Sequence, residues 1–392
     1  MNLFVIAGEA SADLHTANVI RELKKIDPDL QVFGVGGDEM RAAGVELIYH
    51  CHEMAFLGFV EVVKHLPFIL RVAVRLQHAI QERQPDAILL VDYPGFNLRF
   101  AQRLRLRLAE QCPPIIYYIS PQVWAWNSAR IPRIAKLVDK MIVIFPFEVD
   151  LYTNAGLDTE FVGHPLLEEI DFTDRTHRHQ LMKHFNLDPA QPVIGLLPGS
   201  RKQEIERLLP VMLDSVEQIH DTLPIQVVLA VAPTIPSEAI TPILDRWNER
   251  HLPEINYDWN ITHPVMGGSD LLLCCSGTAT LESGLFGTPL IVLYKVSPLS
   301  YQIGKRVVKI PNIGLVNVVA EERIVPEFVQ QDATPENIVP EALNILQNEG
   351  VRKEIQAKLA RIREKLGEMG ASSRTAEIIG HVIKHHSSSA MK

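Results

Sequence analysis

The chain has 392 residues, more than one hydrophobic core comfortably holds, so we expect two domains. A hydrophobic fraction of 47% and a charged fraction of 22% are typical of globular proteins. The formal net charge of −9 argues against a general nucleic-acid binder.

The cysteines Cys51, Cys112, Cys274 and Cys275 have neither CxxC spacing nor the Cys/His spacing of a zinc site. We therefore predict reduced core thiols of a cytosolic protein, with no disulfide framework and no metal site. The N-terminus enters an apolar run without a basic region, so we expect no signal peptide. No uncharged run reaches the ~18 residues that a membrane-spanning helix needs.

Short apolar runs alternate with helical patterns in the first half of the chain. Residues 11–25 and 68–83 have the pattern of helices. The apolar runs predict strands at residues 3–7, 32–35, 87–91, 115–119 and 141–145. Strands that are apolar throughout and separated by helices are typical of a parallel sheet covered on both faces.

The loop GEASAD follows the first strand and opens the first helix. Ser11 is a natural N-cap, and Glu9 and Asp13 suit the positive end of the helix dipole. A second interpretation is that a carboxylate at this strand end points into a cleft and binds hydroxyl groups. The sequence leaves both interpretations open.

Residues 56–76 are apolar but carry dispersed basic side chains. One interpretation is a buried helix with a solvated basic edge. The other is a membrane-interfacial surface, in which apolar side chains enter the lipid boundary and cations meet anionic headgroups. The residues that would form this acceptor and lipid surface are Phe56, Lys64, Phe68, Arg71 and Arg75.

Asp92 ends the apolar run 87–91 and precedes Tyr93 and Pro94, which cannot continue a strand. Apolar neighbours would raise the pKa of this carboxyl and make it a plausible general base. The alternative is a turn cap before Pro94.

Two tryptophans, Trp124 and Trp126, follow the next strand on the loop SPQVWAW. They either form a platform for a sugar or acyl group, or lock the loop to the core. His164 closes the first domain, where it either contacts a phosphate or caps a strand end.

The pattern weakens between residues 166 and 192, a polar stretch that we interpret as the linker. A second series of alternating strands and helices then runs to about residue 319. The last sixty residues are mostly helical and charged. We therefore predict an α/β protein of two doubly wound, Rossmann-like domains with parallel sheets facing each other across a cleft, with ligands at the carboxyl ends of the strands.

The segment LLPGSRKQE reads as a strand that passes through Gly199 into a helix. Ser200, with Gln203 three places on, predicts a capping box at the helix start. The N–H groups of a helix N-terminus and the charge of Arg201 would provide a seat for a phosphate or diphosphate. The alternative is an ordinary strand-to-helix turn with solvated basic side chains.

A second such loop, SGTATLESG, follows the strand at 270–277, and 289–294 reads as the next strand. Ser276, Gly277 and Thr278 would let a ligand approach the backbone, and Glu282 lies where a carboxylate could bind the two hydroxyls of a ribose. It could equally be a surface glutamate. Together the two loops predict one nucleotide held by its diphosphate and its ribose.

These motifs resemble one family, lipid-A-disaccharide synthase. GEASAD, VDYPGFN, YYISPQVWAW, FPFE, FVGHP, LLPGSRKQE, SGTATLE and GLVNVV occur in that family's order and cover nearly the whole chain. The resemblance implies the two-domain GT-B glycosyltransferase fold. It also implies an inverting reaction that joins UDP-2,3-diacylglucosamine to 2,3-diacylglucosamine 1-phosphate and releases UDP and the β-1′,6-linked disaccharide. Members use no metal or other cofactor and act at the cytoplasmic face of the inner membrane of Gram-negative bacteria.

The family's residue roles map onto positions in this chain. Asp92 matches its candidate general base and Glu9 a carboxylate near the acceptor, and which of them is the base stays open. Arg201 matches the diphosphate contact and Glu282 the ribose-binding acid. Asn317, as a polar residue of the nucleotide cleft, rests on the resemblance alone. One departure is Ala12, where the family usually has glycine.

The resemblance also suggests how the domains divide the work. Residues 1–167 would form the acceptor and membrane-facing domain, and 168–369 the UDP-sugar-binding domain. The helices at about 370–392 would either pack back on the first domain or exchange with a partner in a homodimer. Two rival functions share this cleft: a UDP-sugar 2-epimerase and a non-catalytic nucleotide-sugar-binding protein. A nicotinamide dehydrogenase is disfavoured because GVGGDE lacks the spacing of GxGxxG.

Overall fold

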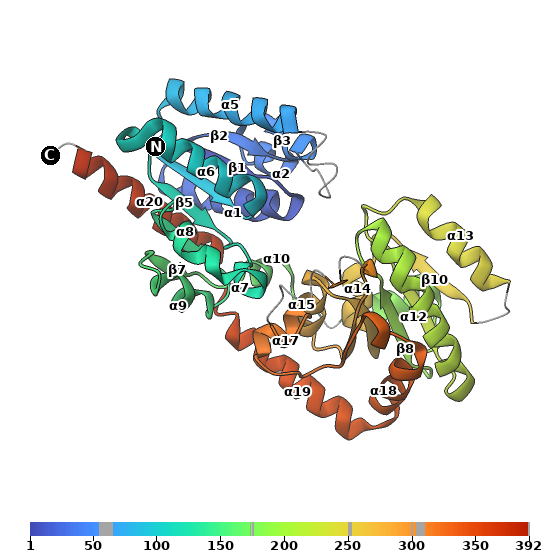
Figure 1. Ribbon diagram of the computed structural model, residues 1–392. Helices are drawn as coiled ribbons and strands as arrows, with labels where there is room; N and C mark the ends of the chain where they lie inside the picture. The colour runs from blue at the N-terminus through green and yellow to red at the C-terminus, as the bar shows by residue number, and fades with distance from the viewer. Residues whose placement is uncertain are drawn as a thin grey trace. The chain divides into compact units, whose positions relative to one another are not determined.

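The computed structural model of the chain describes residues 1–54, 66–172, 174, 176–249, 253–298, 301–302 and 310–390. The chain divides into two compact units, Met1–Glu169 with Gly367–Lys392, and Ile170–Leu366. Each unit is a parallel sheet with helices packed on it (Figure 1).

The first unit is built on a seven-stranded sheet of order β3-β2-β1-β4-β5-β6-β7. All its pairings are parallel, because a helix returns the chain after most strands. The strands are β1 (Asn2–Ala7), β2 (Gln31–Gly36), β3 (Glu46–His50), β4 (Ala87–Val91), β5 (Ile115–Tyr118), β6 (Lys140–Val143) and β7 (Thr159–Phe161).

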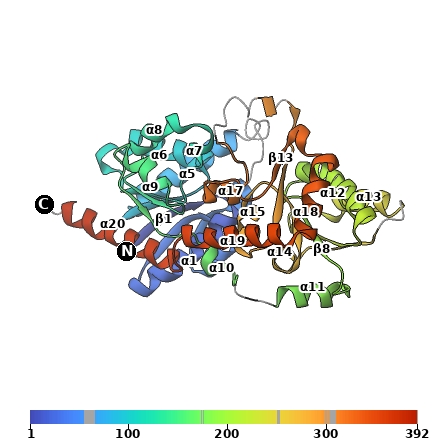
Figure 2. The same ribbon diagram turned by 90° about the horizontal axis from the view of Figure 1, so that it is seen from below.

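The two faces of this sheet receive different helices. Alternate strand residues such as Phe4 and Ile88 pack under α5 and α6 in one apolar cluster. On the other side, α20 lies along α1 (Figure 2). The helices of this unit are α1 (Ala10–Ile26), α2 (Asp38–Ala42), α3 (Cys51–Met54), α5 (Leu66–Arg83), α6 (Pro94–Leu108), α7 (Val123–Trp126), α8 (Ile131–Ala135), α9 (Glu148–Thr153), α10 (Leu166–Glu169) and α20 (Ala371–Ala390).

The second unit has a six-stranded parallel sheet of order β10-β9-β8-β11-β12-β13. Its strands are β8 (Val193–Leu197), β9 (Gln226–Ala230), β10 (Ile255–Asp258), β11 (Leu271–Cys275), β12 (Leu290–Tyr294) and β13 (Glu327–Val329). Its helices are α11 (His177–Phe185), α12 (Lys202–Thr222), α13 (Ser237–Asn248), α14 (Thr262–Gly268), α15 (Thr278–Leu285), α17 (Leu315–Ala320), α18 (Pro335–Gln347) and α19 (Glu349–Lys365).

The predicted α/β class with two doubly wound parallel sheets is confirmed. The region interpreted as a linker is partly helical, however, because it contains α10 and α11. The polar helix α11 is stabilised by packing on α14 rather than by its own pattern. Its Leu181 is fully buried, and the ring of His177 lies against Phe286 at 5.1 Å.

Among the described helices, none combines the length and the apolar character needed to cross a bilayer.

The return of the chain to the first unit depends on Arg374 near the start of α20. Its guanidinium donates to the carbonyl of Val162 from Nε (2.9 Å) and Nη2 (2.6 Å). The same group also donates to the carbonyls of Glu368 and Met369. Two of these four hydrogen bonds hold the C-terminal segment against the chain that follows β7, and the other two fix the turn that precedes α20.

We predict that Arg374→Ala lowers the free energy of unfolding of the first unit by about 2 kcal/mol, because charged hydrogen bonds to backbone carbonyls are lost. Thermal unfolding checks this. The matched control is Arg41→Ala in the same unit, where the arginine is 59% exposed and pairs only with Asp38. A drop of melting temperature equal to that of the control would contradict the assignment.

Candidate active site

In each sheet the strand order reverses once. The reversal lies between β1 and β4 in the first unit and between β8 and β11 in the second. The loops that leave such neighbouring strands run in opposite directions and open a crevice at the carboxyl edge of the sheet. Glu9 and Asp92 follow β1 and β4, and Ser200 and Ser276 follow β8 and β11. These four predicted site residues thus lie at the two reversals.

The reversal in the second unit carries a pocket of about 380 Å³. Both loops that the sequence singled out contribute to its lining, and so does the first turn of each following helix. The predicted residues that line it are Gly199, Ser200, Arg201, Ser276, Gly277, Thr278 and Glu282.

The start of α12 differs from the prediction. The helix begins at Lys202 with Arg201 as N-cap, and the carboxylate that folds back is that of Glu204 rather than a side chain of Gln203. Glu204 Oε2 accepts the N–H of Ser200 at 3.0 Å and that of Arg201 at 3.2 Å. A carboxylate satisfies these unpaired donors better than the neutral amide of Gln203, because the donors lie at the positive end of a helix dipole.

Glu204 also contacts Arg201 directly, because Nη1 of Arg201 donates to its Oε1 at 3.2 Å. The guanidinium is otherwise 67% exposed, so it remains available at the pocket mouth. Gly199 has φ +120°, and a Cβ at this position would overlap the Glu204 carboxylate. The loop is therefore a seat for an anion, and an internal carboxylate occupies its backbone donors.

The second loop supplies the opposite wall of the pocket. The Ser276 hydroxyl donates to the carbonyl of Ile313 at 3.0 Å, which fixes the turn after β11. Gly277 is in an extended conformation, and a Cβ there would meet open space. Thr278 begins α15, and the half-buried Glu282 lies one turn further, 4.0 Å from His263 Nε2. This wall offers small residues beside one carboxylate.

Asn317 does not line this pocket, contrary to the prediction. The residue is fully buried in α17. Its amide nitrogen donates to the carbonyl of Val325 and to Oε1 of Glu327, and its oxygen accepts the N–H groups of Ile324 and Val325. These bonds use both N–H donors and both oxygen lone pairs of the side chain. Asn317 therefore holds the turn before β13 and has no donor or acceptor left for a ligand.

Asp92 lies at the reversal in the first unit, and its pKa is raised to about 6. Burial is the main cause, and the negative charge of Glu9 is the second. Asp92 and Tyr93 both have left-handed backbone, with φ of +43° and +45°. Buried Asn97 holds this turn by donating to the carbonyls of Val91 and Asp92, and Tyr117 donates to that of Asp92 at 2.5 Å. The structure thus holds a half-buried carboxyl beside an exposed one.

Three neighbouring residues have structural roles. Helix α1 begins at Ala10 with Glu9 as N-cap, so Ser11 is not the cap that the sequence suggested. Asp13 is buried and accepts the N–H groups of Gly37, Glu39 and Met40 at the start of α2. His164 is buried and accepts the N–H of Leu166, and burial lowers its pKa to about 3, so it is a neutral cap.

Trp124 is anchored to the core by a residue that the sequence analysis missed. Its Nε1 donates to Glu148 Oε1 at 2.9 Å, and the Ser120 hydroxyl donates to the same oxygen. Burial raises the pKa of Glu148 to about 7. These contacts lock the loop to the sheet. The side chain of Trp126 lies outside the described part of the structure.

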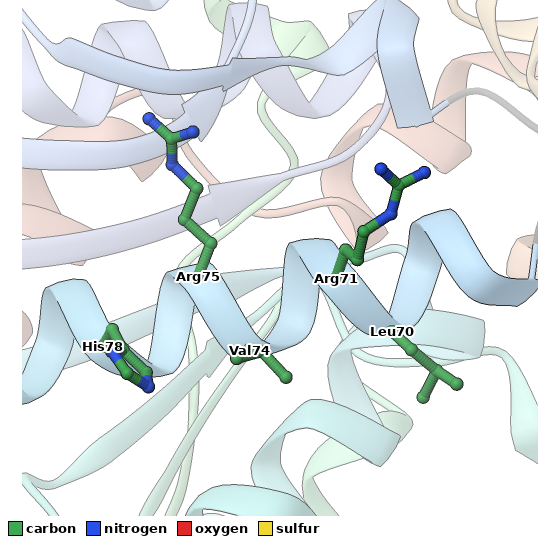
Figure 3. Close-up of a pocket in the computed structure, with 5 residues that line it drawn as sticks. All are labelled: Leu70, Arg71, Val74, Arg75 and His78. Atoms are coloured by element: carbon green, nitrogen blue, oxygen red, sulfur yellow. The ribbon is translucent and has the colours of Figure 1, made fainter.

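Helix α5 carries the described part of the predicted lipid surface; Phe56 and Lys64 lie outside the described residues. Leu66, Leu70 and Val74 are 43%, 52% and 41% exposed and recur every fourth residue. Figure 3 shows Arg71 and Arg75 on one side of α5, with Leu70, Val74 and His78 on the other. The arginines reach over the rings of Phe68 and Tyr49 respectively. An exposed apolar stripe thus runs beside two cations.

One cluster of the described residues has metal-ligand chemistry. His50, Cys51 and His52 bring one ligand atom each within 4.8 Å of one another at the end of β3. The spacing argument overlooked them because they are consecutive in the sequence. Nδ1 of His50 already accepts the N–H of His52 at 3.2 Å, and its Nε2 lies 3.5 Å from Asp38. The cluster is not at the β1/β4 reversal and plays no part in the reaction considered below.

Comparisons with known proteins identify the family. A family model described as lipid-A-disaccharide synthetase matches residues 3–382. The lipid-A-disaccharide synthase of Geobacter sulfurreducens is 42% identical over 378 residues, which is 96% of each chain.

Solved structures share the fold at low identity. A UDP-GlcNAc 2-epimerase from Neisseria meningitidis, solved with UDP-GlcNAc bound, has a TM-score of 0.64 at 14% identity and covers 97% of this chain and 99% of its own. The calicheamicin glycosyltransferase CalG4 has a TM-score of 0.57 at 16% identity, with 98% of both chains covered. These likenesses indicate the GT-B fold, which glycosyltransferases and these epimerases share. The match to the family model and the identity to the Geobacter enzyme show that the chain belongs to the lipid-A-disaccharide synthetase family of glycosyltransferases.

Proposed function

We propose that this protein transfers 2,3-diacylglucosamine from UDP to the 6-hydroxyl of 2,3-diacylglucosamine 1-phosphate, with inversion at the anomeric carbon. The family membership supports the reaction. The observation that carries the site assignment is the convergence of the loops after β8 and β11 on one pocket in the second unit.

The donor's UDP would occupy this pocket. Its diphosphate lies against Arg201 and the N-terminus of α12, and small residues at Gly277 and Ser276 let it approach the backbone. The Glu282 carboxylate accepts hydrogen bonds from the two ribose hydroxyls. The Neisseria epimerase structure holds a UDP-sugar within the same fold, which supports a UDP ligand here.

Diphosphate binding would require Glu204 to leave the backbone donors of Ser200 and Arg201, because two anions cannot share them. Glu204 lines the pocket with 24% of its side chain exposed, so we propose that a change of its side-chain rotamer frees these donors for the diphosphate. The released Arg201 guanidinium would then face the diphosphate. Charge that develops on departing UDP is stabilised by these preorganised groups.

Asp92 would remove the proton from the acceptor's 6-hydroxyl as it attacks. Its pKa of about 6 makes it ionised at neutral pH but basic enough to accept a proton. Glu9 is the other candidate base, and its proposed role is to bind acceptor hydroxyls and to raise the pKa of Asp92 by its charge. Transfer requires the acceptor on the first unit to meet the donor on the second.

The acyl chains of both substrates would reach the active site from a membrane. We propose that α5 lies at the cytoplasmic face of the inner membrane, with its stripe of Leu66, Leu70 and Val74 in the lipid boundary and Arg71 and Arg75 at anionic headgroups. For α20 we propose the intrachain arrangement, because its buried Ala376, Ile379 and Ile383 lie within the first unit.

The direct test of the reaction is mass spectrometry of the products formed from the two acylated glucosamine substrates. The expected product is the tetraacyl disaccharide 1-phosphate, together with UDP. An epimerase would instead convert UDP-GlcNAc alone to its 2-epimer. A non-catalytic binding protein would bind UDP and leave the donor intact.

Arg201→Ala is expected to lower turnover by about 10²–10³, since it removes one donor that stabilises charge in the transition state. Steady-state kinetics with the UDP-sugar measures this. Lys202→Ala is the matched control, because this lysine is also at the start of α12 but is 71% exposed and pairs with Glu206. Near-normal turnover of Arg201→Ala would refute the diphosphate assignment.

Asp92→Asn should abolish most activity and stabilise the fold. Because the folded-state pKa is raised from 3.8 to about 6, ionising Asp92 opposes folding as pH rises through this window. Asparagine also tolerates the left-handed backbone. Relative to the unmodified protein, the variant should gain about 3 kcal/mol of unfolding free energy at pH 8. The gain should shrink below pH 6 and vanish near pH 4.

Urea unfolding at several pH values measures this difference. Exposed Asp29→Asn is the control and should change stability by less than about 0.5 kcal/mol at every pH. A stability gain of Asp92→Asn that did not depend on pH would contradict the buried-carboxyl assignment, and normal turnover would eliminate Asp92 as the base.

Reversing both charges on α5, with Arg71→Glu and Arg75→Glu, should weaken binding to vesicles that contain anionic lipid by at least about tenfold, because each cation near such a surface contributes roughly 1 kcal/mol. Vesicle co-sedimentation measures the binding. Lys353→Glu, a reversal at a lysine 71% exposed on α19, is the control. Unchanged vesicle binding of the double variant would refute the α5 surface.

A further inference from the structure

The first unit has a second hollow, of about 220 Å³, between α6 and the segment from Arg130 to Leu137. Its polar lining comes from Arg99 and Gln102 of α6, and from Arg130 and Arg133 beside α8. Leu98 and Ile134 contribute apolar surface. The lining contains three guanidinium groups and no acidic side chain. A concave surface with this charge is suited to a multiply charged anion.

Two of the arginines in this hollow, Arg99 and Arg133, have no carboxylate partner among the described residues. Arg133 Nη2 donates to Gln102 Oε1 at 2.6 Å. By contrast, Arg105 on the same helix pairs with Asp139 outside the hollow. The guanidinium groups of Arg99 and Arg133 thus keep N–H donors for a ligand.

The hollow opens at the N-terminal end of α6, two residues after Asp92. Pro94 and Gly95 form the first turn and belong to the lining. The positive end of the helix dipole therefore adds to the three charges. A Cβ at Gly95 would meet no atom within 4 Å, so the backbone is open to a ligand here.

The position of the hollow relative to Asp92 is rigid. Asn97 on α6 bonds the carbonyls of Val91 and Asp92, so the strand end and the helix start move as one body. Gly95 and Arg99 are about 6 Å apart along the helix axis, which is about one turn. Pro94 and Gly95, which line the hollow, are the second and third residues after Asp92, so the hollow lies next to this carboxyl along the chain.

We propose that this hollow binds a phosphate monoester, the 1-phosphate of the acceptor sugar, while the 6-hydroxyl of the same sugar faces Asp92. This inference rests on the proposed function, because it assigns the acceptor to the first unit. A phosphate monoester carries a charge of about −1.5 to −2 at neutral pH and accepts the paired N–H groups of arginine. The hollow would select the phosphorylated acceptor and orient its far end toward the base.

The phosphate of an anionic membrane lipid has the same chemistry, so the test must separate the two sources. Kinetics are measured with 2,3-diacylglucosamine carrying or lacking its 1-phosphate, for the unmodified protein, Arg99→Ala, Arg133→Ala and the double variant. Exposed Arg107→Ala on α6, which does not line the hollow, is the control. Co-sedimentation with phosphatidylglycerol vesicles is measured in parallel, and thermal unfolding verifies that each variant folds.

The expected result is a fall of kcat/KM of at least tenfold for the phosphorylated acceptor with each single variant, carried mainly by the acceptor KM. The values for the unphosphorylated acceptor, the KM of the UDP-sugar and vesicle binding should change less than twofold. Arg99→Lys should retain part of the preference for the phosphate.

Equal losses with both acceptors, accompanied by weaker vesicle binding, would assign the hollow to membrane headgroups and overturn the proposal. Unchanged kinetics in the double variant would overturn it too. If the unmodified protein transferred sugar to neither acceptor, the proposed function itself would fail, and this outcome is distinguishable from the other two.

Discussion

Both candidate sites depend on one constraint, the reversal of strand order at the centre of each sheet. Parallel strands end at a common edge, and at the β1/β4 and β8/β11 reversals the outgoing chains diverge and leave backbone uncovered. No single residue creates this crevice; it follows from the topology. In the first unit the loops after β1 and β4 carry carboxylates; in the second, the loops after β8 and β11 carry an arginine, small residues and a helix N-terminus. Carboxylates can accept protons, whereas an arginine and a helix N-terminus can bind phosphate groups.

Carboxylates at these edges do different work depending on their burial. Asp92 is held in a strained turn and its pKa is raised by burial, which opposes folding but suits a base. Glu204, in contrast, accepts hydrogen bonds from the backbone N–H of Ser200 and from the Arg201 guanidinium, which stabilise the start of α12. Asp13 is buried and accepts three backbone N–H groups at the start of α2. The surroundings of the first carboxylate oppose its ionisation, the second satisfies backbone donors at the start of α12, and the third caps α2. Residue type alone does not separate these roles.

Much of the fold followed from local pattern. Strand β4 coincides with the apolar run predicted at residues 87–91, because a strand buried on both faces leaves a continuous hydrophobic signature. Strands β3 and β7 were not predicted, since edge strands are short and partly polar, and α11 was mistaken for linker because tertiary packing on α14 stabilises it. Site loops were recognisable from glycine, proline and charge at strand ends. The partners of those residues were not, because Glu204 and Glu148 are defined by contacts that no spacing rule encodes. Asn317 was misplaced for the same reason: its hydrogen bonds are internal.

The central claim is that the pocket at the β8/β11 reversal holds the diphosphate of UDP. A crystal structure of the protein with UDP tests it most directly. The account predicts the diphosphate beside the Arg201 guanidinium and Gly277, the ribose hydroxyls at Glu282, and the Glu204 carboxylate turned away from the N–H groups of Ser200 and Arg201. UDP bound elsewhere, with Glu204 still on those N–H groups, would contradict it.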